Sequence, residues 1–336
     1  MKKIYYTIVV LMILTACNSG TKSEYNVNPD KGKTIKNTVI ATHKDTYYDI
    51  QITDSFVAFL DYKSDTVVQI YKKDDFSKLH QFVLREGANG KFVSPKFTKS
   101  DQLDKHTNSL LLVDNNYLKT LQLNPNQEGE SVSIQTAKLS SKLTNSIQYN
   151  FITDNILAVS TMDNVNNLFY YFGSGEYYWV KPEPALLPNY KNIPNVFASN
   201  LCVNESVNSI ACALRFVNII QFYSLDAEKT VSIQIGKDIL PPILGERRSG
   251  VDIVNTPKYC IDMVGTSRYV YCLYDGSTDY SVGSTIFIFD WTGKHISTLK
   301  TKNNLRKIVV DKEDTHLIAL AGNETAGLDV LMVEIH

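Results

Sequence analysis

Short runs of β-branched and aromatic residues alternate with turns of Asp, Asn, Gly and Ser along the chain from about residue 34 onward. The side chains of such runs suit the half-buried surface of a sheet, and the residues between them favour turns. Apolar positions do not recur at helical spacing anywhere in the sequence. The pattern therefore predicts an all-β protein. Clear examples of these runs are residues 56–60, 67–71, 210–216, 269–274, 286–289 and 317–321.

The runs group into units of about 35–55 residues, and each unit reads as up to four strands joined by turns. Units of this length and content are typical of the blades of a β-propeller. Six units begin near residues 48, 97, 147, 196, 257 and 305. The sequence therefore predicts a six-bladed β-propeller, and two separate β-sandwiches are the alternative.

The last unit is one strand short of the others. The run at residues 34–42, which precedes the first unit, can supply the missing strand. Such an exchange joins the two ends of the chain in one blade and removes an exposed sheet edge. We therefore expect a single propeller domain over residues 34–336, closed by its N-terminal strand.

The N-terminus carries a separate signal. Lys2 and Lys3 precede an apolar run at 4–14, which is too short for a bilayer-spanning helix of about 20 residues. Residues 14–17 read Leu-Thr-Ala-Cys, which resembles the lipobox of bacterial lipoproteins. The resemblance implies that residues 1–16 are a signal peptide and that Cys17 is lipidated and becomes the first mature residue. An ordinary signal peptide followed by a chance cysteine is the alternative.

Residues 17–33 are rich in Ser, Asn, Gly and Lys, and we expect a flexible tether there. Loss of residues 1–16 leaves 32 basic and 35 acidic residues, a net charge of −3. This balance does not favour nucleic acid as a partner. A lipid-anchored protein of the cell envelope is expected, in the outer membrane. The periplasmic side is favoured over the cell surface, because no acidic cluster follows Cys17.

Three segments resemble the TolB-like six-bladed propeller lipoproteins of Bacteroidetes. Residues 85–92 are similar to the Gly-rich turn that ends the first blade in that family. Residues 286–294 are similar to its late strand and turn, and residues 308–311 with 317–320 to its closing blade. The resemblance implies a propeller and a cell-envelope location. It implies no particular activity, because a shared propeller does not transfer function.

Catalytic and nucleotide-binding motifs are not found in the sequence, and neither is an EF-hand calcium loop. Some six-bladed propellers are calcium-dependent hydrolases with the metal on the channel axis. Four residues near strand ends could contribute oxygen ligands to such a site, although Asp and Asn are also expected in turns. These weak metal candidates are Asp114, Asn115, Asp154 and Asp275.

Three long loops are better candidates for ligand binding, because long ordered loops often carry function. They cover residues 181–195, 236–252 and 275–284. Adjacent arginines in the second loop offer planar donors that suit carboxylate, phosphate or sugar groups. A simple solvated loop is the alternative. The candidate ligand-binding residues are Tyr190, Glu246, Arg247, Arg248, Asp275 and Tyr280.

Four cysteines remain besides Cys17, and they form two pairs that each flank a likely hairpin turn. Cys202 and Cys212 are symmetric about residue 207, and Cys260 and Cys272 about residue 266. Directly opposed antiparallel positions are close enough for a disulfide, which an exported protein can form. Small buried thiols are the alternative reading. The spacing does not suggest zinc.

Together these features predict a propeller that binds or scaffolds a protein or glycan partner at the membrane, more readily than an enzyme. No cofactor is expected for this function. A calcium-dependent hydrolase or lyase with its site in the central channel is the alternative. Calcium would then be the cofactor.

Overall fold

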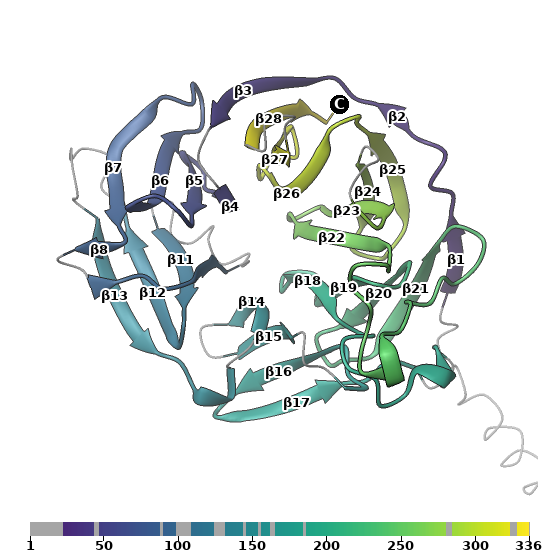
Figure 1. Cartoon of the computed structure of the whole chain (residues 1–336). Helices are drawn as coiled ribbons and strands as arrows, with labels where there is room; N and C mark the ends of the chain where they lie inside the picture. The colour runs from purple at the N-terminus through teal and green to yellow at the C-terminus, as the bar shows by residue number, and fades with distance from the viewer. Residues whose placement is uncertain are drawn as a thin grey trace, which may run out of the picture.

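The computed structural model describes residues 23–43, 47–87, 90–98, 109–123, 132–143, 146–153, 156–161, 165–183, 186–279, 284–322 and 328–335. Six small antiparallel sheets surround a central axis, and each sheet is one blade of a β-propeller (Figure 1). The predicted fold class is therefore confirmed. The expected starting points of the blades agree with the structure within three residues.

Each of the first three blades consists of four strands that are consecutive in the sequence, with the first strand nearest the axis and the fourth at the outer edge. The first blade contains β4 (Tyr47–Ile52), β5 (Phe56–Asp61), β6 (Thr66–Lys72) and β7 (Lys78–Leu84). The second contains β10 (Pro95–Phe97), β11 (Ser109–Asp114), β12 (Tyr117–Gln122) and β13 (Ser133–Lys138). The third contains β14 (Ser146–Thr153), β15 (Ile156–Thr161), β16 (Phe169–Gly173) and β17 (Glu176–Val180). A two-stranded hairpin of β8 (Glu86–Gly87) and β9 (Gly90–Lys91) links the first two blades.

The last three blades each include a strand from the N-terminal segment. The fourth blade contains β18 (Ser199–Asn204), β19 (Ser209–Leu214), β20 (Ile219–Ser224) and β21 (Lys229–Ile235). The fifth contains β22 (Lys258–Gly265), β23 (Tyr269–Ser277), β24 (Thr285–Asp290) and β25 (His295–Lys300). The sixth contains β26 (Asn304–Val310), β27 (His316–Gly322) and β28 (Leu328–Glu334).

The sixth blade is completed by β3 (Asn37–His43), which pairs antiparallel with β28. This strand falls within the run at 34–42 that was expected to supply the missing strand. Its pairing satisfies the backbone groups along β28 that would otherwise form an open sheet edge. The propeller is thus closed by hydrogen bonds between the two ends of the chain.

The tether predicted at 17–33 extends too far along the chain. β1 (Ser23–Val27) pairs in parallel with β21, and β2 (Lys33–Thr34) pairs in parallel with β25. The N-terminal segment therefore follows the outer edges of the fourth and fifth blades before it enters the sixth (Figure 1). Backbone hydrogen bonds along a sheet edge order this segment, although few of its side chains are apolar.

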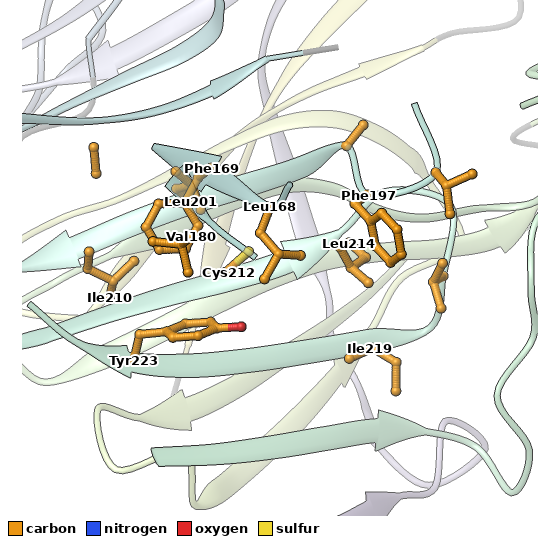
Figure 2. Packing of buried hydrophobic residues seen from close by; sticks show 14 of the residues in the cluster. Leu168, Phe169, Val180, Phe197, Leu201, Ile210, Cys212, Leu214, Ile219 and Tyr223 are labelled. Atoms are coloured by element: carbon orange, nitrogen blue, oxygen red, sulfur yellow. The ribbon is translucent and has the colours of Figure 1, made fainter. Parts of the chain in front are cut away.

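Buried side chains pack between neighbouring blades. Between the third and fourth blades, Leu168, Phe169 and Val180 contact Leu201 and Cys212 (Figure 2). All five side chains are buried, and contacts of this kind supply the main apolar stabilisation of the ring. Among the described residues, no helix is long and apolar enough to cross a membrane.

The register of two hairpins bears on the possible cysteine pairs. Cys202 lies opposite Ala211 and Cys212 opposite Leu201, so their side chains occupy different faces of the fourth blade and different hydrophobic clusters. A shift of one residue sends a side chain to the other face of a sheet. Cys260 and Cys272 do lie together, with their Sγ atoms 3.4 Å apart. All four cysteines are free thiols in the structure.

Candidate functional site: the axial cavity

A ring of polar side chains connects the innermost strands of all six blades. Each of these side chains reaches from its own blade to the inner strand of the next blade around the ring. We call the set the inner belt: Asp49, Lys96, Gln148, Asn200, Asp262 and Lys307. The two lysines are half-buried and the other four side chains are buried. Buried polar groups stabilise a fold only when they are paired, as these are.

Three links of the inner belt are hydrogen bonds of 2.9–3.1 Å from a backbone amide to a side-chain oxygen. These amides belong to Phe97, Leu201 and Ile308, and the accepting side chains to Asp49, Gln148 and Asp262. Two further links run to backbone carbonyls: Lys96 Nζ donates to Ser146 over 3.3 Å, and Asn200 Nδ2 to Cys260 over 3.0 Å. The belt thus fixes the inner strands relative to one another.

Lys307 closes the inner belt. Its Nζ lies 3.5 Å from Asp262 Oδ1 and 3.8 Å from Asp49 Oδ1, so it joins the fifth, sixth and first blades. Burial alone would lower the pKa of Lys307, but the two carboxylates outweigh that effect and raise the pKa. For Lys96, burial dominates and lowers the pKa, and nearby Lys307 and Arg215 add to the effect.

An axial cavity of about 330 Å³ lies beside the inner belt. Its walls come from inner strands of all six blades and from the turns that follow four of them, at residues 53–54, 205–206, 266–267 and 311–312. Asp49 of the belt also lines it. A volume of this size is at the lower end of the range for small-molecule sites. Because the cavity is built by rigid strands, its shape is largely preformed.

Two buried oxygen atoms in the axial cavity have no hydrogen-bond partner in the described part of the chain. They are Gln51 Oε1 and Asn150 Oδ1, on side chains that are only 6% and 1% exposed. The amide nitrogens do have partners: Gln51 Nε2 donates to Thr98 over 3.5 Å, and Asn150 Nδ2 to Ala158 over 3.4 Å. An unpaired buried acceptor costs stability, so these oxygens favour a ligand that donates hydrogen bonds.

Asp49, Asp54 and Asp311 line the axial cavity and have structural partners, whereas the side chain of Glu205, which also lines it, is exposed. Asp49 accepts hydrogen bonds from the Phe97 and Ile50 amides in addition to its ion pair with Lys307. Asp54 forms a 2.8 Å ion pair with Lys312. Asp311 accepts hydrogen bonds from the hydroxyl and amide of Thr315, and these outweigh burial and lower the pKa of Asp311. Hydrogen bonds and ion pairs therefore hold these three aspartates in place at the wall of the cavity.

The residues predicted from the long loops do not line the axial cavity. The loops at 181–195 and 236–252 precede the inner strands β18 and β22, so they lie on the face opposite the turns that line it. The structure does bring them together, because the guanidinium of Arg248 donates to the backbone oxygen of Asn189. Tyr190 packs partly against the core, and the side chains of Glu246 and Arg247 are exposed.

The three weak metal candidates that the structure describes, Asp114, Asn115 and Asp275, do not line the axial cavity. Asp114 accepts hydrogen bonds from the Val93 and Ser94 amides and forms a 2.8 Å ion pair with Lys119. Asn115 lies in the turn after β11 with a left-handed φ of 57°. Asp154 and Tyr280 lie outside the described residues.

Asp275 is buried within β23 and accepts a 2.7 Å hydrogen bond from the Ser277 hydroxyl. Burial raises the pKa of this carboxyl. Calcium takes about six to eight oxygen ligands, usually including carboxylates. Among the described residues, no three acidic, His or Cys side chains are placed to hold a metal ion. The described residues therefore show no cluster of carboxylates of the kind that calcium usually takes.

We did not predict the inner belt or the two acceptors of the axial cavity from the sequence, although the inner strands carry a pattern that indicates them. Each inner strand carries polar residues inside a buried run, such as Asp49 and Gln51 in β4 and Gln148 and Asn150 in β14. In a half-buried strand, polar residues are expected on the solvent face. Their recurrence in the first strand of successive blades could have indicated an axial site.

No protein-family model matches this chain, and no curated protein matches its sequence. Solved structures of similar fold include a member of the DUF4221 family from Bacteroides vulgatus. It is 13% identical, with a TM-score of 0.59, over 90% of this chain and 99% of that one. A calcium-binding regucalcin from Agrobacterium tumefaciens is 10% identical, with a TM-score of 0.51, over 90% and 96% of the two chains.

The WD40 repeats of RRP9 are also similar, at 9% identity and a TM-score of 0.56, over 91% of this chain and 99% of that one. At such low identity these likenesses show the fold alone. The protein is a six-bladed β-propeller with a cavity on its axis.

Proposed function

We propose that the protein is a lipid-anchored binding module of the cell envelope, whose axial cavity receives a small hydrogen-bond-donating group of its partner. The terminal sugar of a glycan has the matching chemistry, because its hydroxyl groups can donate to Gln51 Oε1 and Asn150 Oδ1. The observation that carries this proposal is the presence of two unpaired, buried acceptors in one preformed cavity.

The walls of the axial cavity support a sugar-sized ligand. Its volume of about 330 Å³ accommodates a small ligand or one end of a larger one. Ile50, Ile52 and Phe97 provide apolar surface beside the amide groups of Gln51 and Asn150. Sites that combine apolar walls with a few oriented polar groups are typical of small-molecule recognition.

The lipid anchor rests on the sequence. The lipobox at residues 14–17 and the resemblance to TolB-like propeller lipoproteins support lipidation of Cys17. The fold shared with a Bacteroides protein is compatible with that origin. We further propose an outer-membrane location, with the propeller on the periplasmic side. The mass of the mature N-terminal peptide tests the anchor independently of any ligand.

Binding to an array of bacterial and dietary oligosaccharides tests the proposed ligand class. The wild-type protein is compared with the double variant Gln51→Leu, Asn150→Leu, which removes both acceptors with similar side-chain volumes. Asn189→Leu on the opposite face is the matched control. We expect specific signals for the wild type and the control that the double variant loses, because a sugar hydroxyl would meet no acceptor.

Three other outcomes would reject the proposal. Signals that survive in the double variant but disappear in Arg247→Ala or Arg248→Ala would assign binding to the loop face. Wild-type protein that binds no glycan, but captures a protein through those arginines in a pull-down, would favour the scaffold role without the cavity. A rise in melting temperature with calcium chloride that the double variant lacks would favour the hydrolase alternative, because a ligand stabilises by mass action.

A further inference from the structure

The unpaired buried side-chain atoms of the axial cavity are all acceptors. Gln51 Nε2 donates to the carbonyl of Thr98, and Asn150 Nδ2 donates to that of Ala158. Because a carbonyl can only accept, these two contacts fix the orientation of the amide groups and leave their oxygens free. Among the described residues that line the cavity, no buried side-chain donor lacks a partner. A ligand that satisfies these atoms therefore donates hydrogen bonds and finds no unpaired side-chain donor beside them.

The walls of the axial cavity carry an excess of negative charge. Lys312 is the one basic residue among the described residues that line it, whereas four carboxylates do so: Asp49, Asp54, Glu205 and Asp311. Lysines compensate two of the four, because Asp49 pairs with Lys307 and Asp54 with Lys312. Within the described part of the chain, neither Asp311 nor Glu205 forms an ion pair with a lysine or an arginine.

Asp311 stays ionised although it is buried. Burial alone would raise the pKa of this carboxyl, but hydrogen bonds from Thr315 and from the His316 amide outweigh that effect and lower the pKa. The Nδ1 atom of His316 also lies 3.1 Å from Asp311 Oδ2. Both carboxylate oxygens are thus engaged, so Asp311 contributes negative charge to the cavity wall and no free acceptor.

Glu205 lies at the mouth of the axial cavity, with its side chain exposed. Hydrogen bonds of the buried Asn204 hold the chain next to it, because Asn204 Nδ2 donates to the backbone oxygens of Thr266 over 3.4 Å and Ser267 over 3.2 Å. Asn204 Oδ1 accepts a 2.6 Å hydrogen bond from the Ser206 hydroxyl. These contacts join the turns of the fourth and fifth blades. Among the described residues, the Glu205 carboxylate has no partner, so its charge is available to a ligand.

We propose that the group received by the axial cavity is a protonated amine, carried by an amino sugar whose nitrogen is not acetylated. The inference rests on the proposed function and specifies its ligand. An ammonium group has three N–H donors and no acceptor, so it can donate to Gln51 Oε1 and Asn150 Oδ1 and leave no lone pair unsatisfied. A hydroxyl has one donor and two lone pairs, which would meet only acceptors. Charge-assisted hydrogen bonds are also the stronger kind, and Asp311 and Glu205 supply the opposite charge.

Calorimetric titration of the full chain at neutral pH with three trisaccharides of the same linkage tests this inference. They are the trisaccharides of glucosamine, of N-acetylglucosamine and of glucose, which carry an amine, an acetamide or a hydroxyl at the same position of each sugar. We expect the glucosamine trisaccharide to bind about tenfold or more tightly than the other two at low salt. This advantage should shrink in about 0.5 M sodium chloride, because salt screens the exposed charge of Glu205.

The substitution Glu205→Gln removes the charge and keeps the shape of the side chain. We expect it to weaken binding of the glucosamine trisaccharide about threefold or more, with little effect on the other two. Glu228→Gln, at an exposed turn position that does not line the cavity, is the matched control and should bind like the wild type. The double variant Gln51→Leu, Asn150→Leu should lose the glucosamine trisaccharide.

Equal binding of the three trisaccharides, lost in the double variant, would overturn the inference and leave the proposed function in place. Binding of the glucosamine trisaccharide that survives in the double variant would also overturn it, because the charge would then act at the surface alone. Failure of all three to bind would overturn it as well. The oligosaccharide array then decides separately whether the cavity receives another glycan.

Discussion

Lys307 of the sixth blade lies 3.8 Å from Asp49 of the first blade, and this ion pair closes the inner belt between the last blade and the first. The same two blades are adjacent because β3 completes the sixth blade immediately before β4 begins the first. Two contacts therefore close the ring: the pairing of β3 with β28 at the outer edge of the sixth blade, and the ion pair between Lys307 and Asp49 near the axis.

The substitution Asp49→Ala should lower the free energy of unfolding by about 2–4 kcal/mol. It leaves the Phe97 amide without its acceptor and removes one of two carboxylates from Lys307. Urea denaturation measures the change. Asp226→Ala, at an exposed turn position, is the control and should change little. Equal effects of the two substitutions would show that the inner belt does not stabilise the ring.

Removal of β3 should open the propeller. A chain that lacks residues 18–36 keeps β3 and should stay folded and monomeric, with some loss of stability from β1 and β2. A chain that lacks residues 18–43 exposes the edge of β28, and we expect it to associate or aggregate. Size-exclusion chromatography distinguishes the two. A monomeric, cooperatively folded product of the longer deletion would contradict the closure.

His295 should make the stability depend on pH. Burial lowers its pKa, a hydrogen bond with the Ser297 backbone opposes the shift only in part, and the ring lies against Phe287 and Phe289. The unfolded chain then binds a proton at higher pH than the native protein does. The free energy of unfolding should therefore fall as the pH drops below about 6.5.

Urea denaturation between about pH 7.5 and pH 5 measures this contribution of His295. Since glutamine carries no charge in this range, the stability of His295→Gln should fall less steeply than that of the wild type. Parallel profiles for the two proteins would exclude His295 as the source.

The four buried thiols should resist modification in the native protein. Burial raises the pKa of Cys212 to about 12, and a hydrogen bond from Cys272 to Cys260, with burial, raises the pKa of Cys272. Cys212 and Cys272 are then thiols at neutral pH, and burial shields all four cysteines from a reagent in solution. A thiol reagent should label none of the four before denaturation and all four afterwards. Labelling of only two after denaturation would show that Cys260 and Cys272 form a disulfide in the mature protein.

The architecture could be predicted from the sequence because its signals are local. Each blade has its own turn residues and β-branched runs, and the count of strands in the last unit pointed to the strand that became β3. β1 could not be predicted in this way. Its parallel pairing with β21 depends on backbone hydrogen bonds, and Val27 is the one buried side chain among the residues of β1 whose burial is described, 25–27.

The candidate site was harder to predict because it depends on closure of the ring. Gln51 and Asn150 are separated by 99 positions and face one cavity only after the blades surround the axis. The loops at 181–195 and 236–252 stood out in the sequence because of their length. They do contact each other, but on the face of the propeller opposite the turns that line the axial cavity. For Cys202 and Cys212, symmetry about residue 207 misplaced the register by one residue, which reversed the face of the sheet.

The acceptors of the axial cavity should cost stability in the absence of ligand. Asn150→Leu removes an unpaired buried oxygen together with a long 3.4 Å hydrogen bond to Ala158. We expect the free energy of unfolding to stay within about 1 kcal/mol of the wild type or to rise. A loss of several kcal/mol in urea denaturation would mean that the Asn150 side chain is structural.

Calorimetric titration of the full chain with the strongest oligosaccharide from the array tests the central claim most directly. The account predicts that Asn150→Leu weakens binding by about tenfold or more, because the loss of one buried hydrogen bond costs about 1–3 kcal/mol, while Asn189→Leu binds like the wild type. Equal affinity of Asn150→Leu and the wild type would contradict the assignment of the axial cavity as the binding site.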